Sequence, residues 1–176
     1  MAAAARTSTA LEGARELSVR LPLSAAPADV LRLLDTDASR WLGEPLDASA
    51  EGPAIGMAGS RRRFATDLRL RVSDRSPRAL FRKAAIVELG TPFEANGIVS
   101  VEIGWRAATL APLFPVFSGR LSVDSHDATL RGLYAPPGGR IGQIADDALF
   151  HIAAEGTAKW LLREMAAILA DGQRGG

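Results

Sequence analysis

The chain has 176 residues, of which 47% are hydrophobic and 23% are charged, a composition typical of one globular domain that buries a sizeable core. Its 21 basic and 20 acidic residues leave a formal net charge of +1, which gives no reason to expect nucleic acid or an anionic membrane as a partner. Cysteine is absent, which excludes disulfides, a thiol nucleophile and a thiolate metal site.

The two ends of the chain differ in composition from the middle. The N-terminal stretch MAAAARTSTALEG is too short and too weakly apolar for a signal segment or a membrane span. We predict a disordered leader over residues 1–12, one folded domain over 13–171 and a flexible tail over 172–176. A cytoplasmic location is then the default expectation.

The domain is predicted to start with one strand and two short helices. The stretch ARELSVRLPL alternates in polarity, which predicts a half-buried strand whose inner face carries Leu17, Val19, Leu21 and Leu23. SAAPADVLRLLDT predicts a helix with Pro27 in its first turn and an apolar stripe of Val30, Leu31 and Leu34. DASRWLG predicts a second helix that is anchored by Trp41 and ends at Gly43. Helices this short must pack against something to be stable.

The middle of the chain predicts a run of antiparallel strands. The segments are FATDLRLRV, LFRKAAIVEL, IVSVEIGWR, LFPVFSGRLSVD and ATLRGLY. Asn96-Gly97 is a two-residue hairpin signal, and SHD joins the last two strands. Strands with one polar face favour an antiparallel sheet over a parallel one.

Two stretches next to these strands have a less regular pattern. Residues 43–60 carry no clear period, and we interpret them as a mobile edge of the domain. The only basic run, RRR at 61–63, predicts a solvated strand start.

The C-terminal segment GRIGQIADDALFHIAAEGTAKWLLREMAAILA predicts one long helix over about residues 140–170. Its apolar residues fall within one broad sector, its early turns carry Asp146 and Asp147, and its later turns carry Lys159 and Arg163, as the helix dipole prefers. The fold class is therefore α+β. A curved sheet with one apolar face can bury that face by wrapping around this helix, with the two short helices closing one end and a cavity between helix and sheet.

This order of elements resembles the helix-grip fold of the START-like superfamily, also called SRPBCC. LPLSAAPADVLRLLDTDASRWLG is similar to the family's first strand and helix pair, and LRGLYAPPGGRIGQIADDALFHIAAEGTAKWLLREMA to its last strand, Pro/Gly corner and C-terminal helix. The likeness spans about residues 13–171. It implies binding or transport of hydrophobic ligands; some members are polyketide cyclases or aromatases, and others are subunits or regulators.

Five residues are candidates to line the cavity. Trp105, Phe117 and Tyr134 occupy inward positions of three predicted strands, and Val101 and Ile103 share the inward face with Trp105. Plain core packing is the alternative interpretation. Tyr134 is the most informative, because a buried hydroxyl needs a partner. We predict that these residues line an apolar pocket of a few hundred Å³.

His151, Glu155 and Lys159 lie one turn apart on a face of the long helix that is otherwise apolar. Four interpretations are open: Lys159 extends from the edge of the sector to solvent, the three form a buried network that only tethers the helix, they contact a ligand, or they perform acid–base catalysis. We expect His151 and Glu155 to point into the space between helix and sheet. Glu155 should then pair with His151, Lys159 or Tyr134, because an unpaired buried carboxylate is costly.

Catalytic and metal-binding patterns are weak in this sequence. Besides His151 the chain has His126, in a predicted hairpin turn. A serine–histidine–acid triad would need His151, and no serine is marked as its nucleophile. Asp147 and His151 have the spacing of metal ligands on a helix, but no third ligand is evident. PPGGRIG fails the G-x-G-x-x-G spacing and predicts a turn. We assign no catalytic residue, no metal and no cofactor.

The function that these observations predict is binding, with transport or sequestration, of a hydrophobic small molecule or lipid. The expected partner is that ligand, without nucleic acid and without integral membrane association, and a homodimer stays open. The alternatives are a polyketide cyclase-like or aromatase-like enzyme and a non-binding protein-interaction module. The scarcity of polar catalytic groups favours binding over catalysis.

Overall fold

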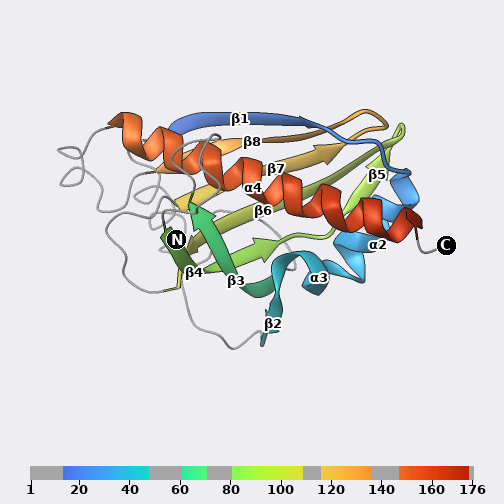
Figure 1. Ribbon diagram of the computed structural model, residues 1–176, viewed down its shortest axis with the longest axis horizontal. Coiled ribbons are helices and arrows are strands. Elements are labelled where there is room, and N and C mark those ends of the chain that lie inside the picture. The colour runs from blue at the N-terminus through green and yellow to red at the C-terminus, as the bar shows by residue number, and fades with distance from the viewer. Residues whose placement is uncertain (1–13, 48–60, 71–80, 109–115, 136–146, 175–176) are drawn as a thin grey trace, which may run out of the picture.

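The computed structural model describes residues 14–47, 61–70, 81–108, 116–135 and 147–174. They form one antiparallel sheet with a long helix lying along one of its faces (Figure 1). The predictions for the leader over 1–12, for most of the irregular stretch 43–60 and for PPGGRIG lie outside the described residues.

The predicted elements follow one another in the expected order, and the structure adds two short strands that were not predicted, β2 and β5. The strands are β1 (Arg15–Pro22), β2 (Glu44–Leu46), β3 (Arg62–Leu70), β4 (Phe81–Leu89), β5 (Phe93–Ala95), β6 (Ile98–Ala107), β7 (Val116–Val123) and β8 (Asp127–Ala135). The helices are α2 (Pro27–Asp35), α3 (Ala38–Leu42) and α4 (Asp147–Arg174).

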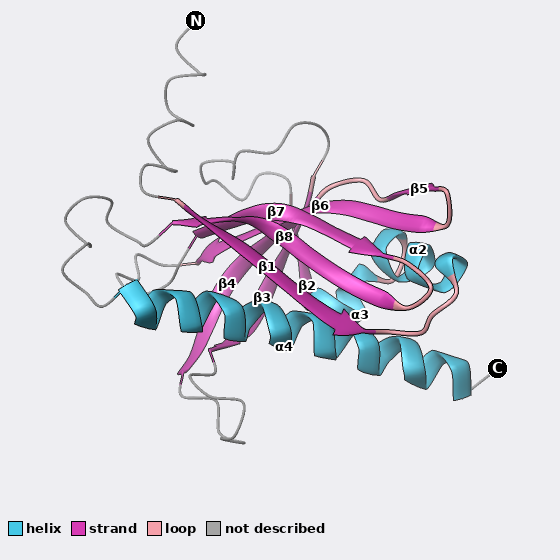
Figure 2. Cartoon of the chain, turned by 90° about the horizontal axis from the view of Figure 1, so that it is seen from above, coloured by secondary structure: helices cyan, strands magenta, loops and turns pink. Residues whose placement is uncertain are grey.

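The strands described here make one 8-stranded sheet in the order β1-β8-β7-β6-β4-β3-β2, with β5 paired to β6. Every pairing between these strands is antiparallel. Helix α4 packs against β1 and β8 near one edge of the sheet and against β3 near the other (Figure 2). Because one helix contacts strands near both edges of the sheet, the sheet must curve around it. This confirms the predicted helix-grip architecture.

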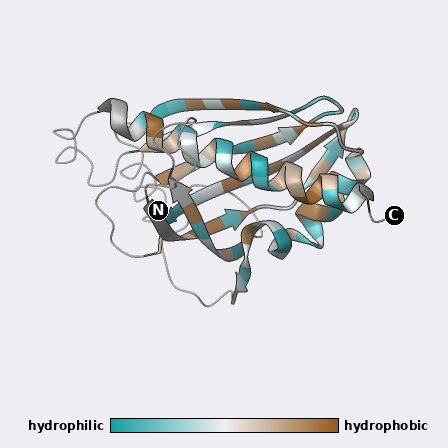
Figure 3. Cartoon of the chain, in the orientation of Figure 1, coloured by the Kyte–Doolittle hydropathy of each residue, from teal (hydrophilic) through white to brown (hydrophobic). Residues whose placement is uncertain are grey.

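Period-2 alternation decides which face of each strand is buried. In β6 the outward Glu102 is half-exposed, whereas the inward side chains on either side of it are all buried. These inward side chains are Val99, Val101, Ile103 and Trp105. Figure 3 shows polar and apolar segments along the strands and along α4. The β5–β6 hairpin turns at Asn96 (φ 53°) and Gly97 (φ 75°), and this left-handed pair confirms the two-residue turn.

The two short helices close one end of the sheet. Pro27 begins α2, and the buried side chains of this helix are Val30, Leu33 and Leu34, so the stripe is rotated by one position from the predicted one and includes Leu33 in place of Leu31. Helix α3 ends at Gly43, whose φ of 92° favours glycine, and its Trp41 is buried. Both helices contact α4, which supplies the packing that such short helices need.

The C-terminal helix is described over 28 residues, Asp147–Arg174. It ends at Arg174, beyond the expected end near Ala170, and its predicted beginning near residue 140 lies outside the described residues. Its buried side chains change in size along the axis. Between residues 153 and 158 the buried side chains are small (Ala153, Ala154, Thr157, Ala158), and from Trp160 onward they are large (Trp160, Leu161, Leu162, Met165, Leu169).

The basic run is not the solvated strand start that the sequence predicts. The side chains of Arg61 and Arg63 are only 14% and 17% exposed, because both extend over the outer face of the sheet to Glu88, which is 0% exposed. Arg62 donates to the main-chain oxygens of Leu34 and Asp35 at the end of α2. Local alternation cannot reveal these contacts, because each joins β3 to another element.

Candidate functional site

Three aromatic side chains form a row across the inner face of the sheet. Trp105 on β6 is the register partner of Phe117 on β7, and Phe117 is in turn the partner of Tyr134 on β8. The rings of Trp105 and Phe117 stack with centroids 4.0 Å apart and an interplanar angle of 17°. All three side chains are buried. We call Trp105, Phe117 and Tyr134 the aromatic row.

Two facing glycines make room for this row. Gly119 and Gly132 are register partners on β7 and β8. A Cβ atom built on Gly119 would lie 2.6 Å from Phe117 Cζ, and one built on Gly132 would lie 2.8 Å from the same atom. The Phe117 ring therefore occupies the volume that two side chains would otherwise take. Glycines inside predicted strands can indicate such a close approach, but we did not predict it from the sequence.

One end of the row is joined to α4 by a hydrogen bond. Tyr134 Oη lies 3.1 Å from His151 Nδ1, and either group can donate, depending on the imidazole tautomer. The two rings are 5.9 Å apart between centroids and tilted by 44°. Tyr134 is buried but His151 is exposed, so the imidazole lies at the edge of the row. His151 thus points toward the sheet, as predicted, but its side chain remains exposed and is not enclosed between helix and sheet.

Glu155 pairs with Lys159 at 3.0 Å between Oε1 and Nζ. This is one of the three partners predicted for Glu155. Their side chains are 39% and 32% exposed, so the pair lies at the margin of the helix face and not in a buried patch. A half-exposed pair of this kind contributes about 0.3–0.5 kcal/mol to helix stability. The structure thus separates the predicted trio: His151 contacts the aromatic row, and Glu155 and Lys159 pair with each other.

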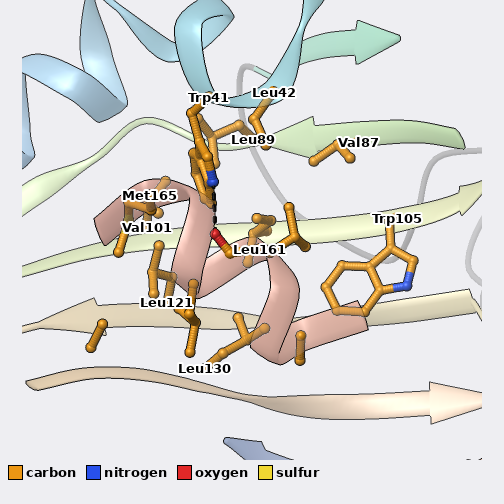
Figure 4. Packing of buried hydrophobic residues seen from close by; sticks show 14 of the residues in the cluster. Trp41, Leu42, Val87, Leu89, Val101, Trp105, Leu121, Leu130, Leu161 and Met165 are labelled. Atoms are coloured by element: carbon orange, nitrogen blue, oxygen red, sulfur yellow. Dashed lines mark hydrogen bonds between the residues drawn. The ribbon is translucent and has the colours of Figure 1, made fainter. Parts of the chain in front are cut away.

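The opposite end of the row carries an unusual polar group. Trp105 is 0% exposed, and its indole Nε1 is buried without a hydrogen-bond partner among the described residues. Figure 4 shows this nitrogen on the side of the ring away from Leu161. A buried donor without a partner costs about 1–3 kcal/mol. Buried polar groups usually have a hydrogen-bond partner, so this unpartnered indole N–H on an inward-facing side chain needs an explanation. No sequence pattern could have indicated it.

Val101 and Ile103 lie on β6 next to Trp105 and are buried in the same continuous hydrophobic cluster. Val101 faces the part of the core that contains Leu121, Leu161 and Met165 (Figure 4). The structure therefore brings five of the seven predicted ligand-binding residues together on one face of the sheet, with His151 at its edge and Glu155 apart. That they bind a ligand stays a prediction.

The described residues contain no cluster of three or more histidine, cysteine, aspartate or glutamate side chains that could hold a metal ion. Among the helices described, none is both long enough and apolar enough to cross a membrane.

No protein-family model and no curated protein sequence matches the chain. Solved structures do resemble it. A conserved protein from Geobacillus kaustophilus has a TM-score of 0.51 at 9% identity, covering 89% of this chain and 96% of that one. Protein Ms6760 from Mycobacterium smegmatis has a TM-score of 0.48 at 14% identity, covering 94% of each chain. A STAR-related lipid transfer protein fragment from Xanthomonas axonopodis has a TM-score of 0.43 at 20% identity, covering 86% and 85%.

Identities this low establish the fold alone. The strand order and the position of α4, together with the likeness to the Geobacillus kaustophilus protein, confirm the predicted helix-grip fold. The activity must be argued from the site itself.

Proposed function

We propose that the protein binds a hydrophobic small molecule that carries a hydrogen-bond acceptor, such as a carbonyl oxygen, between the aromatic row and the first half of α4. The observation that carries this proposal is the buried indole N–H of Trp105, which has no partner among the described residues. An apolar wall with one unused donor suits a ligand that is mostly hydrocarbon and has one oxygen.

The size gradient along α4 supports the same location. The hydrogen bond between Tyr134 and His151 brings the first half of α4 to the aromatic row, and the bond from Trp41 to Leu161 brings the second half to α3. Large aliphatic side chains are buried from Leu161 onward, whereas those buried between residues 153 and 158 are three alanines and Thr157. A ligand would displace the least side-chain volume opposite the alanines, next to the three rings.

A second candidate function is an enzyme of the polyketide cyclase or aromatase class. Its support is the contact between the Tyr134 hydroxyl and the His151 imidazole at 3.1 Å, since these two groups can exchange a proton. Binding is favoured over catalysis because, among the described residues in and beside the aromatic row, His151 and Tyr134 are the only pair of groups that can exchange a proton. An enzyme would lose turnover in Tyr134→Phe while keeping affinity for its substrate.

The test starts with native mass spectrometry of the protein purified from its own host, to detect a co-purifying apolar ligand. Apolar fluorescent probes with and without a carbonyl group are then titrated into the wild type and into Trp105→Phe, which keeps the ring and removes the N–H. We expect carbonyl probes to lose about fivefold to tenfold in affinity and hydrocarbon probes to lose little, as for one hydrogen bond of about 1 kcal/mol.

Trp160→Phe is the matched control. Trp160 also has a buried Nε1 without a partner among the described residues, but it lies on α4 beyond the alanines at 153–158 and does not belong to the aromatic row. Its substitution should leave the affinity of both probe types unchanged. The proposal fails if no probe binds the folded protein, or if both tryptophan variants change probe affinity equally.

A further inference from the structure

The strand β1 forms one edge of the sheet. Among the described strands it pairs with β8 alone, over its full length of 8 residues and in one unbroken register. The strand at the opposite edge, β2, has only 3 residues. A long edge strand presents a row of unpaired main-chain N–H and C=O groups, which is a template for pairing with another strand.

The hydrogen bond that follows β1 shows which of its main-chain groups face away from β8. Leu23 N–H donates to the main-chain oxygen of His126 at 2.8 Å, in continuation of the β1–β8 register. Because the main-chain groups of successive residues alternate in direction, the odd-numbered residues of β1 face β8 and the even-numbered ones face the free edge. The residues that face the free edge are Glu16, Ser18, Arg20 and Pro22, of which the last has no N–H.

The side chains of these even-numbered residues are exposed, whereas Leu17 and Val19 between them are buried on the face that packs against α4. Glu16 has no ion-pair partner among the described residues. Arg20 pairs with Asp127, but its side chain is 68% exposed, so its guanidinium keeps N–H donors for a second carboxylate. The edge is thus held in place from one side and is open to a partner, which lowers the entropic cost of pairing.

The charges of β1 favour one pairing with a second copy of the same strand. In an antiparallel pair with its two-fold axis at Ser18, Glu16 of each copy lies opposite Arg20 of the other. An axis at Glu16 or at Arg20 places two like charges opposite each other. Axes at Leu17 and Val19 place Ser18 opposite Glu16 or Arg20 and form neither ion pair. The strand is therefore complementary to itself in one register.

We propose that β1 is a dimerisation strand, through which two copies of this chain join their sheets edge to edge about a two-fold axis at Ser18. The main-chain hydrogen bonds provide the affinity, and the two pairs between Glu16 and Arg20 select the register. Such a contact uses the same edge of both copies, so it closes at the dimer. The interface does not involve the aromatic row and does not depend on the ligand-binding function proposed above.

The first test is sedimentation equilibrium of the full-length protein, over protein concentrations from about 1 µM to about 1 mM. We expect a reversible equilibrium between monomer and dimer. Glu16→Arg places like charges at both ends of the pairing and should raise the dissociation constant at least about tenfold. The charge exchange Glu16→Arg with Arg20→Glu should bring it back to within about threefold of the wild type. Glu94→Arg, at an exposed glutamate on β5, is the control and should dimerise as the wild type does.

A second test locates the axis and leaves both charges of the pairing unchanged. The chain has no cysteine, so Ser18→Cys introduces one thiol at the proposed axis. The two Cα atoms of a directly opposed hydrogen-bonded pair lie about 5.5 Å apart, so a bismaleimide with a short spacer should join two copies of this variant. Ser125→Cys, at an exposed position in the turn between β7 and β8, should stay uncrosslinked at the same protein concentration.

Three results would overturn the proposal. One is a wild type that stays monomeric over the whole concentration range. Another is a dimer whose dissociation constant is the same in Glu16→Arg as in the wild type, which would place the interface elsewhere. The third is equal crosslinking of Ser18→Cys and Ser125→Cys. Circular dichroism of each variant verifies that it is folded, and Ser18→Cys keeps the proposal testable if the charge exchange beside Asp127 prevents folding.

Discussion

Trp41 on α3 donates its indole N–H to the main-chain oxygen of Leu161 in the middle of α4, across 3.0 Å and 120 positions of sequence. The bond is buried and is drawn as a dashed line in Figure 4. It fixes the distance between the short helices and the long one at the closed end of the sheet. The anchor role predicted for Trp41 from its place in DASRWLG thus has a specific partner.

We expect Trp41→Phe to lower the free energy of unfolding by about 1–2 kcal/mol, from one lost hydrogen bond and a small loss of packing. Urea denaturation followed by circular dichroism measures the change. Trp160→Phe is the comparison, because the Nε1 that it removes has no partner among the described residues. A loss at position 160 as large as that at 41 would show that ring volume, and not the hydrogen bond, determines the effect.

Gly119 and Gly132 should not tolerate alanine. A Cβ on Gly119 would lie 2.2 Å from the main-chain oxygen of Arg131, and one on Gly132 would lie 2.3 Å from that of Ser118. Backbone atoms in a paired strand cannot move aside, so each substitution should cost about 1–3 kcal/mol or more. Gly172→Ala is the control, because its Cβ would meet nothing within 4 Å, and alanine there should be neutral or slightly stabilising. Equal stabilities of the three variants would contradict the close approach.

Local patterns were sufficient to predict the architecture, although not the short strands β2 and β5. Strand alternation identified the buried side chains of β6, and Pro27, Gly43 and Asn96-Gly97 marked ends and turns where the structure has them. The C-terminal helix was predicted because few residues interrupt its apolar sector. These signals depend on neighbours in sequence, and the packing solution for one curved sheet and one long helix is nearly unique.

The candidate site was harder to predict, because its geometry depends on contacts between distant elements. Successive helix positions differ by about 100° in direction, so a small rotation of α4 moves His151 from the interior to the edge. In the same way, Glu88 on β4 is buried because Arg61 and Arg63, from and just before the neighbouring strand β3, extend to its carboxylate. The unpartnered N–H of Trp105 likewise depends on what surrounds it and not on its own segment.

Replacing Glu88 should be among the most destabilising single changes on the outer face of the sheet. This carboxylate is 0% exposed and holds two guanidinium groups, so Glu88→Gln leaves two positive charges close together without their counter-charge. Loss of one member of a buried ion pair costs on the order of 3 kcal/mol. Glu102→Gln, whose side chain is 40% exposed and 3.9 Å from Arg120, should change stability by less than about 1 kcal/mol. Chemical denaturation of both variants checks the contrast, and similar losses would contradict it.

The turn between β7 and β8 should be sensitive to acid. Asp124 Oδ1 accepts main-chain hydrogen bonds from His126 and Asp127, each at 2.8 Å. These two bonds, the first from His126, hold the pKa of the Asp124 carboxyl below its ordinary value, and the positive charges of His126 and Arg20 act in the same direction. Because the pKa is lower in the folded than in the unfolded chain, the stabilisation is present at neutral pH and is lost as the pH falls below about 4.

Two variants separate charge from hydrogen bonding at this turn. Asp124→Asn keeps an acceptor oxygen but removes the charge, so it should be less stable than the wild type at about pH 7 and approach it at about pH 3. Asp124→Ala also removes the acceptor and should stay below the wild type at both pH values. The urea midpoint of each variant, measured across this range, gives the comparison. A difference between Asp124→Asn and the wild type that stays constant with pH would show that the charge of Asp124 does not stabilise the turn.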